Sequence, residues 1–142
     1  MPAPQHESLA AEIREAHCGF LPERAVPGMV RVQRARDASM ARALADTTAT
    51  GARPVVLIAG RGHVRADRGV PAGLDRLGVD GRRLVLGLVE VDPARTAPAD
   101  AAAEAGAARP PYDLVWFTGH DMRDDPCERL RQHMTKGGGK GG

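Results

Sequence analysis

Residues 54–59, with the sequence PVVLIA, constrain the fold of this chain more than any other segment. A near-continuous apolar run rich in β-branched residues is typical of a strand buried on both faces of a parallel sheet. Similar runs at residues 84–91 and 112–118 predict two further strands. Because helical patterns and long connections separate the runs, we predict an α/β fold: a small, mostly parallel sheet of about three strands, flanked by helices.

Apolar residues at helical spacing predict four helices around this sheet. They cover residues 7–17, 29–45, 71–77 and 126–134. Between the first two helices, residues 17–28 contain two prolines and two glycines and therefore predict a turn. A second turn is expected at residues 78–81.

The helix at residues 29–45 is predicted to bury one face. The apolar side holds Met29, Val32, Met40, Ala43 and Leu44, and the opposite side holds Arg31, Arg34 and Arg42. Gln33 and Arg36 interrupt the apolar side, and burying a guanidinium without a partner is too costly. We therefore expect Arg36 to be largely shielded, close to an acidic group or to the loop that follows residues 54–59.

The composition predicts a domain with a small hydrophobic core. Apolar residues make up 42% of the chain but aromatic residues only 3%, so little area is buried per residue. Residues 92–111 are rich in Ala and Pro and predict a loose loop with a helical turn at residues 101–105, and residues 136–142 predict a flexible Gly/Lys tail. We interpret residues 1–135 as a partial domain, because three strands are few for a free-standing sheet.

Charge and hydropathy argue against two classes of partner. The net charge is +2 and no basic run is interleaved with aromatic residues, a pattern that does not favour nucleic acid. No segment approaches the roughly 20 apolar residues that cross a bilayer, so no integral membrane segment is expected. The first residues lack the features of a signal peptide. As written, the chain is expected in the cytoplasm.

The loop after residues 54–59 carries the main candidate for chemistry. It reads Gly60-Arg61-Gly62-His63, and ligands gather beyond the carboxyl ends of parallel strands. Glycines permit close approach to a ligand, and a histidine there can bind a metal, donate to a carboxylate or move a proton. The alternative is a structural turn with a surface histidine. Neither Gly-rich phosphate-binding motif is present.

The segment VVLIAGRGHVRADRGVPAGL resembles the C-terminal signature of the ChaN family, in which an apolar strand leads into A-G-x-G-H and then G-[VI]-P. Four other segments resemble the family in the same order: HCGFLP at 17–22, QRARDASMA at 33–41, YDLVWFT at 112–118 and DPCERL at 125–130. The G-x-x-H of the loop is also similar to the second of the paired motifs that mark the Tiki superfamily.

This resemblance implies a haem-binding protein of haem or iron uptake, periplasmic or membrane-anchored and often a lipoprotein. In the family, haem is bound in a dimer, a tyrosine ligates the iron, and a histidine and a lysine hold the propionates. The chain resembles only the family's C-terminal half, so either a homodimer or a missing N-terminal half is implied as its partner. No lysine lies in a motif, which leaves arginines for the propionates, and Tyr112 does not align with the family's iron ligand.

Seven residues are the resulting candidates for haem binding. They are His63, Gly60, Gly62, Arg65, Arg36, Gln33 and His17. For His17 the alternative is a helix-end histidine that stabilises the helix dipole. Asp37 either reaches a propionate or pairs with a neighbouring arginine. The axial ligand of the iron stays open.

Two other functions and one covalent bond also stay open. His63 as one ligand of a divalent ion would suit a metal-dependent hydrolase, although a catalytic site needs about three protein ligands. A non-functional remnant that needs its other half is the second alternative. Cys18 and Cys127 fit no metal-binding spacing. They are ordinary thiols or, because both lie in family-like segments, a disulfide.

Overall fold

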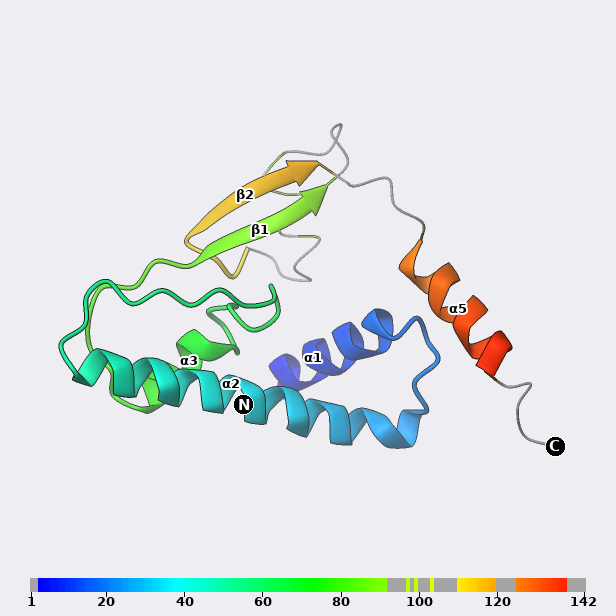
Figure 1. Ribbon diagram of the computed structural model, residues 1–142, viewed down its shortest axis with the longest axis horizontal. Coiled ribbons are helices and arrows are strands. Elements are labelled where there is room, and N and C mark those ends of the chain that lie inside the picture. Colours follow the sequence, from blue (N-terminus) through cyan, green and yellow to red (C-terminus); the bar gives the residue numbers. More distant parts are fainter. Residues whose placement is uncertain are drawn as a thin grey trace.

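The computed structural model describes residues 3–91, 110–119 and 125–137, together with 97, 99 and 103. Within these residues lie four α-helices, one short 3-10 helix and two strands (Figure 1). In chain order they are α1 (Ala3–Ala16), η1 (Glu23–Ala25), α2 (Val26–Ala49), α3 (Val70–Arg76), β1 (Leu86–Val91), β2 (Leu114–Gly119) and α5 (Pro126–Gly137). The predicted α/β class and all four predicted helices are therefore confirmed. Most of the predicted loop at 92–111 and of the predicted tail at 136–142 lies outside the described residues. The first two residues of that tail, Lys136 and Gly137, belong to α5, so the prediction of a tail is wrong for them.

Helices α1 and α3 both pack against α2. Leu9, Ala10 and Ile13 of α1 form one buried cluster with Val26 and Val30 of α2. The two helices are joined by a tight turn, in which Cys18 and Gly19 adopt positive φ angles of 56° and 72°. This turn confirms part of the break expected at residues 17–28, but α2 already begins at Val26.

A second buried cluster joins α2 to α3. It consists of Ala41, Val70 and Leu74, with Leu57 packed against it. The backbones approach closely here, since a Cβ added at Gly73 would lie 2.7 Å from the Cβ of Ala41. The turn expected after α3 is present, with positive φ at Gly78 and Gly81.

Strands β1 and β2 form a parallel pair, as predicted. The register runs from Leu86 opposite Leu114 to Val91 opposite Gly119. The ring of Tyr112 lies against Gly87, where an added Cβ would come within 2.6 Å of the ring. Among the described elements, the two strands make their main contacts with each other and few with the helices.

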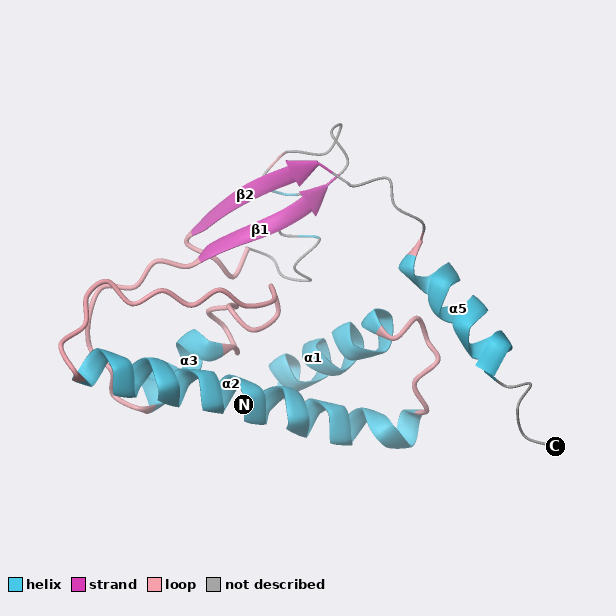
Figure 2. Ribbon diagram, in the orientation of Figure 1, coloured by secondary structure: helices cyan, strands magenta, loops and turns pink. Residues whose placement is uncertain are grey.

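The prediction of a strand at residues 54–59 is wrong, since the structure assigns no strand there. The segment is extended but is drawn as loop (Figure 2), and within the described residues no backbone hydrogen bond involves residues 55–59. Leu57 faces the α2–α3 cluster, whereas Val56 and Ile58 are 75% and 94% exposed. An apolar run reports that a segment favours burial, but a strand forms only where a neighbouring strand satisfies its backbone.

The predicted phase of α2 is also wrong. The side chains that α2 buries are Val26, Val30, Asp37 and Ala41, while Arg36 and Arg42 are both exposed. The helix is thus turned by slightly less than one residue's step of about 100° from the expected orientation. One reason is Asp37, which sequence patterning counts as a surface residue although it is buried and paired with His63.

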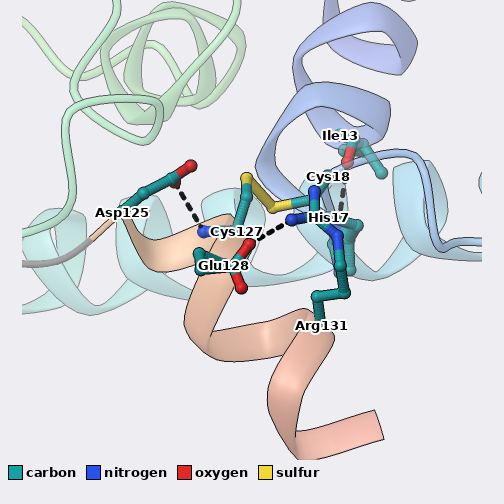
Figure 3. Close-up of a disulfide and its surroundings, with 7 residues drawn as sticks. All are labelled: Ile13, His17, Cys18, Asp125, Cys127, Glu128 and Arg131. Carbon is teal, nitrogen blue, oxygen red and sulfur yellow. Dashed lines mark hydrogen bonds and ion pairs between the residues drawn. A yellow bond between two sulfur atoms is a disulfide. The ribbon is translucent and has the colours of Figure 1, made fainter. Parts of the chain in front are cut away.

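A disulfide between Cys18 and Cys127 ties α5 to the turn after α1, with 5.5 Å between the Cα atoms (Figure 3). The two cysteines are therefore joined in a disulfide and are not free thiols. No helix within the described residues has the length and apolar character that crossing a bilayer requires.

Candidate functional site

A cleft of about 340 Å³ lies between α1, α2 and the loop at residues 60–63. Its lining comes from these three segments and from the turn after α1: Glu12, Ile13, Ala16, His17, Met29, Val32, Gln33, Arg36, Gly60, Arg61, Gly62 and His63. Six of the seven candidate residues are therefore brought together around one cavity. The seventh, Arg65, does not line it.

The backbone holds His63 in a tight loop, as expected, after the extended segment at 54–59. The His63 amide donates to the Gly60 carbonyl at 2.9 Å, and the His63 carbonyl accepts from the Val70 amide at 2.7 Å. Gly69 passes so close that an added Cβ would overlap the His63 carbonyl oxygen. Because α3 starts at Val70, this hydrogen bond ties His63 to the first residue of a helix that packs on α2.

The imidazole of His63 contacts two residues of α2. Its Nδ1 lies 2.6 Å from Oδ1 of Asp37, and the amide nitrogen of Gln33 lies 3.1 Å from Nδ1 and 3.4 Å from Nε2. Asp37 is only 5% exposed. Burial raises the pKa of the Asp37 carboxyl above its ordinary value, although the hydrogen bond and charge of His63 act in the opposite direction.

Sequence analysis missed Asp37 as the partner of His63, although one signal was available. Gln33 and Asp37 are four residues apart, so on a helix they occupy the same face. A carboxylate one turn from a glutamine on the side of the predicted sheet is a candidate partner for a histidine. Glu12, which lines the cleft from α1, had no comparable signal in the sequence.

Arg36 and Arg61 place two guanidinium groups at the cleft. Both residues line it and both are exposed. The expectation that Arg36 is shielded is thus wrong, because its side chain faces an open cavity rather than the core. Its position beside the loop at 60–63 agrees with the expectation. Two cations on an open rim favour an anionic ligand.

Arg65 has a structural position. It is buried and donates to Asp67 through Nε at 2.9 Å and through a terminal nitrogen at 2.8 Å. Burial by itself would raise the pKa of the Asp67 carboxyl, but the hydrogen bond and charge of Arg65 outweigh it and lower that pKa. Arg68, also buried, bonds to Ser8 and Glu12 of α1 and so joins the same loop to the first helix.

His17 lies at the end of α1 and also lines the cleft. Its Nδ1 donates to the carbonyl of Ile13 at 2.7 Å, near the end of α1, and its ring lines the cleft. His17 directly precedes Cys18, so the disulfide anchors the backbone beside it (Figure 3).

Tyr112 lies outside the cleft lining, next to Gly87 of the sheet. Burial raises the pKa of its hydroxyl. Within the described residues, no three side chains among His, Cys, Asp and Glu gather so as to hold a metal ion.

A protein-family model described as haem-binding uptake, Tiki superfamily, ChaN matches residues 1–74, slightly more than half of the chain. All the residues that line the cleft lie within this match. No curated protein and no solved structure matches the chain.

Proposed function

The chain belongs to the ChaN family of the Tiki superfamily, and from that premise we propose that its cleft binds haem. When bound, haem would bring an iron that takes an axial ligand and two propionates that take cationic or hydrogen-bonding partners. The single observation that carries the proposal is the lining of the cleft, because it combines imidazoles, guanidinium groups and apolar side chains around one cavity.

The residues present fit this group by their chemistry. Ile13, Met29 and Val32 supply apolar surface, which controls the access of water to haem iron. The volume of about 340 Å³ lies at the lower end of small-molecule sites, which range from about 300 to 1,000 Å³. Since the cleft opens to solvent, part of the porphyrin would extend beyond it.

Arg36 and Arg61 are the proposed partners of the propionates. Guanidinium groups suit carboxylates because they donate two parallel hydrogen bonds. Gln33, Gly60 and Gly62 would complete the wall, with His17 and His63 as the nitrogen donors. Arg65 would not touch haem but would stabilise the loop through its hydrogen bonds to Asp67.

We further propose that the bound form includes a second polypeptide surface, as the family resemblance implies, and that the role is haem or iron uptake. Apolar side chains on the sheet support the first point. Leu88 and Trp116 are exposed, and exposed apolar patches commonly mark interaction sites. The partner is a second copy of the chain or a further part of the protein.

A haem titration followed in the Soret region tests the proposal. The double variant Arg36→Ala with Arg61→Ala should weaken binding by about a hundredfold, from two lost charge-assisted contacts of roughly 1.4 kcal/mol each. Arg42→Ala is the matched control, because Arg42 is exposed on the same helix but outside the cleft. Absence of a Soret change with the unmodified protein, or equal loss in the control, would contradict the proposal.

A further inference from the structure

We propose that Glu12 is the positioning residue of the cleft: its carboxylate, held by Arg68, sets how closely the loop at residues 60–63 approaches α1. This inference rests on the proposed haem function, because the same loop carries Arg61, a proposed partner of the propionates. Its geometrical basis is two contacts of one carboxylate. Oε2 of Glu12 accepts a hydrogen bond from Arg68, and a Cβ added at Gly62 would lie only 2.8 Å from Oε1.

Arg68 holds the Glu12 carboxylate from the interior of the protein. The side chain of Arg68 is only 2% exposed, and its terminal nitrogens donate to Glu12 and, at 2.9 Å, to the hydroxyl of Ser8. Because Ser8 and Glu12 are four residues apart, they lie on the same face of α1. Hydrogen bonds between charged groups are about twice as strong as neutral ones, so the end of the Glu12 side chain is not free to move.

The burial of Arg68 is costly. Within the described residues its Nε has no hydrogen-bond partner. Burial lowers the pKa of the guanidinium below its ordinary value, and the charge of Arg65 acts in the same direction. Since replacing a buried ion pair by apolar side chains is often neutral for stability, stability alone does not account for this pair. What the pair provides is a defined position for the Glu12 carboxylate.

Gly62 is the residue of the loop that meets this carboxylate. It is not among the glycines with positive φ, so the backbone conformation does not require a glycine. The contact does, because 2.8 Å from a Cβ to Oε1 of Glu12 is closer than non-bonded atoms pack. A flexible carboxylate could move aside, but Arg68 prevents this movement. At Gly60, by contrast, the atom nearest to an added Cβ would be Cδ2 of His63, at an ordinary 3.7 Å.

The position of Gly62 determines where its neighbours in the loop lie. Arg61 and His63, on either side of it in the sequence, both line the cleft. A binding site must hold such groups within about 0.5 Å of the geometry that suits the ligand. Glu12 therefore acts on ligand binding through the loop and does not itself bind the propionates.

A haem titration in the Soret region tests the inference. Gly62→Ala should push the loop away from α1 and weaken binding by roughly tenfold, because a small displacement of binding groups is costly. Glu12→Asp in the same chain shortens the side chain by one methylene, gives the added methyl group room and should restore most of the affinity. Since aspartate keeps the negative charge, this recovery reports the position of the carboxylate and not its charge.

Gly28→Ala is the matched control for the titration. Gly28 belongs to α2, lies outside the cleft lining and has room for a methyl group, since the nearest atom to an added Cβ would be a terminal nitrogen of Arg31 at 3.8 Å. The control should leave haem affinity unchanged.

Thermal melts without haem test the contact itself. Gly62→Ala should lower the melting temperature by about 5–10 °C through overpacking, and Gly60→Ala, which has the same effect on the unfolded chain, should lower it much less. Glu12→Asp should recover part of the loss. In an Arg68→Met background the carboxylate is free to move, so there Gly62→Ala should cost about half as much or less. This background should fold, because the Glu12 side chain is 40% exposed and water can solvate it.

Two results would overturn the inference without affecting the haem proposal. One is a Gly62→Ala variant with the haem affinity of the unmodified protein and the melting temperature of Gly60→Ala. The other is a loss of affinity in Gly62→Ala that Glu12→Asp does not reduce. Failure of the unmodified protein to bind haem would instead refute the proposed function, and the role of Glu12 in binding with it, whereas the melts would still report whether Glu12 limits the approach of the loop.

Discussion

The helical side of the molecule and its sheet side bury their apolar side chains to very different extents. On the helical side, Val30 of α2 is 2% exposed and Ala41 is fully buried. On the sheet side, Trp116 of β2 is 65% exposed and Ile58 of the extended segment is almost entirely so. The helical side buries its apolar surface by packing its helices on one another. The sheet side buries Val89 of β1 but leaves other large apolar side chains exposed.

The cleft belongs to the well-packed side. All its lining residues come from α1 and the residue that follows it, from α2 and from the loop at 60–63, within the part of the chain that matches the family. The candidate site and the exposed apolar surface of the sheet are therefore built from different parts of the chain. Changes to the sheet should affect association more than the geometry around His63.

The largest effect is expected from the disulfide, which joins the turn after α1 to α5. Its cysteines are 109 residues apart, and on the chain-entropy account closing a loop of that size stabilises by about 4–5 kcal/mol. The double variant Cys18→Ser with Cys127→Ser should lose up to this amount in urea unfolding. Under reducing conditions the unmodified protein should match the variant, and a reductant-insensitive transition would contradict the prediction.

A smaller effect should distinguish the two sides directly. Val30→Ala removes two buried methyl groups and should cost about 2 kcal/mol. Ile58→Ala removes more atoms, but from an exposed position, and should cost within about 0.5 kcal/mol. Urea denaturation at low protein concentration measures both. Equal losses of unfolding free energy would show that residues 54–59 are buried in solution. The exposed side chains would then belong to an interface, and the two sides would not differ.

The smallest effect is expected in the acid stability of the protein, and it arises from an ion pair on the helical side. Because Arg65 lowers the pKa of Asp67 in the folded state, the ion pair stabilises fully above the ordinary carboxyl pKa of about 3.9. That contribution disappears as the pH falls through the lowered folded-state pKa. The melting temperatures of the unmodified protein and Asp67→Asn should therefore converge below about pH 4. Asp46→Asn serves as control, and parallel curves would exclude the mechanism.

Local patterns predicted the parts of the molecule that depend on near neighbours. Helical spacing predicted α1, α2 and α3 because each buries a stripe of its own side chains. The parallel pairing of β1 with β2 followed from the long connection between two apolar runs. The motif at residues 60–63, with Gln33, Arg36 and His17, predicted the residues that meet at the cleft, because the family resemblance combines segments that are distant in sequence.

By itself, the sequence thus determined which segments are helical, the parallel pairing and most residues of the candidate site. Only the tertiary structure decided the orientation of α2, the partner of His63, the inward position of Arg65 and, among the described residues, the lack of a strand partner for residues 54–59. The physical reason is shared by all four. Each depends on a contact between groups whose cost of burial is set by what lies opposite, as Asp37 and His63 show across 26 residues of chain.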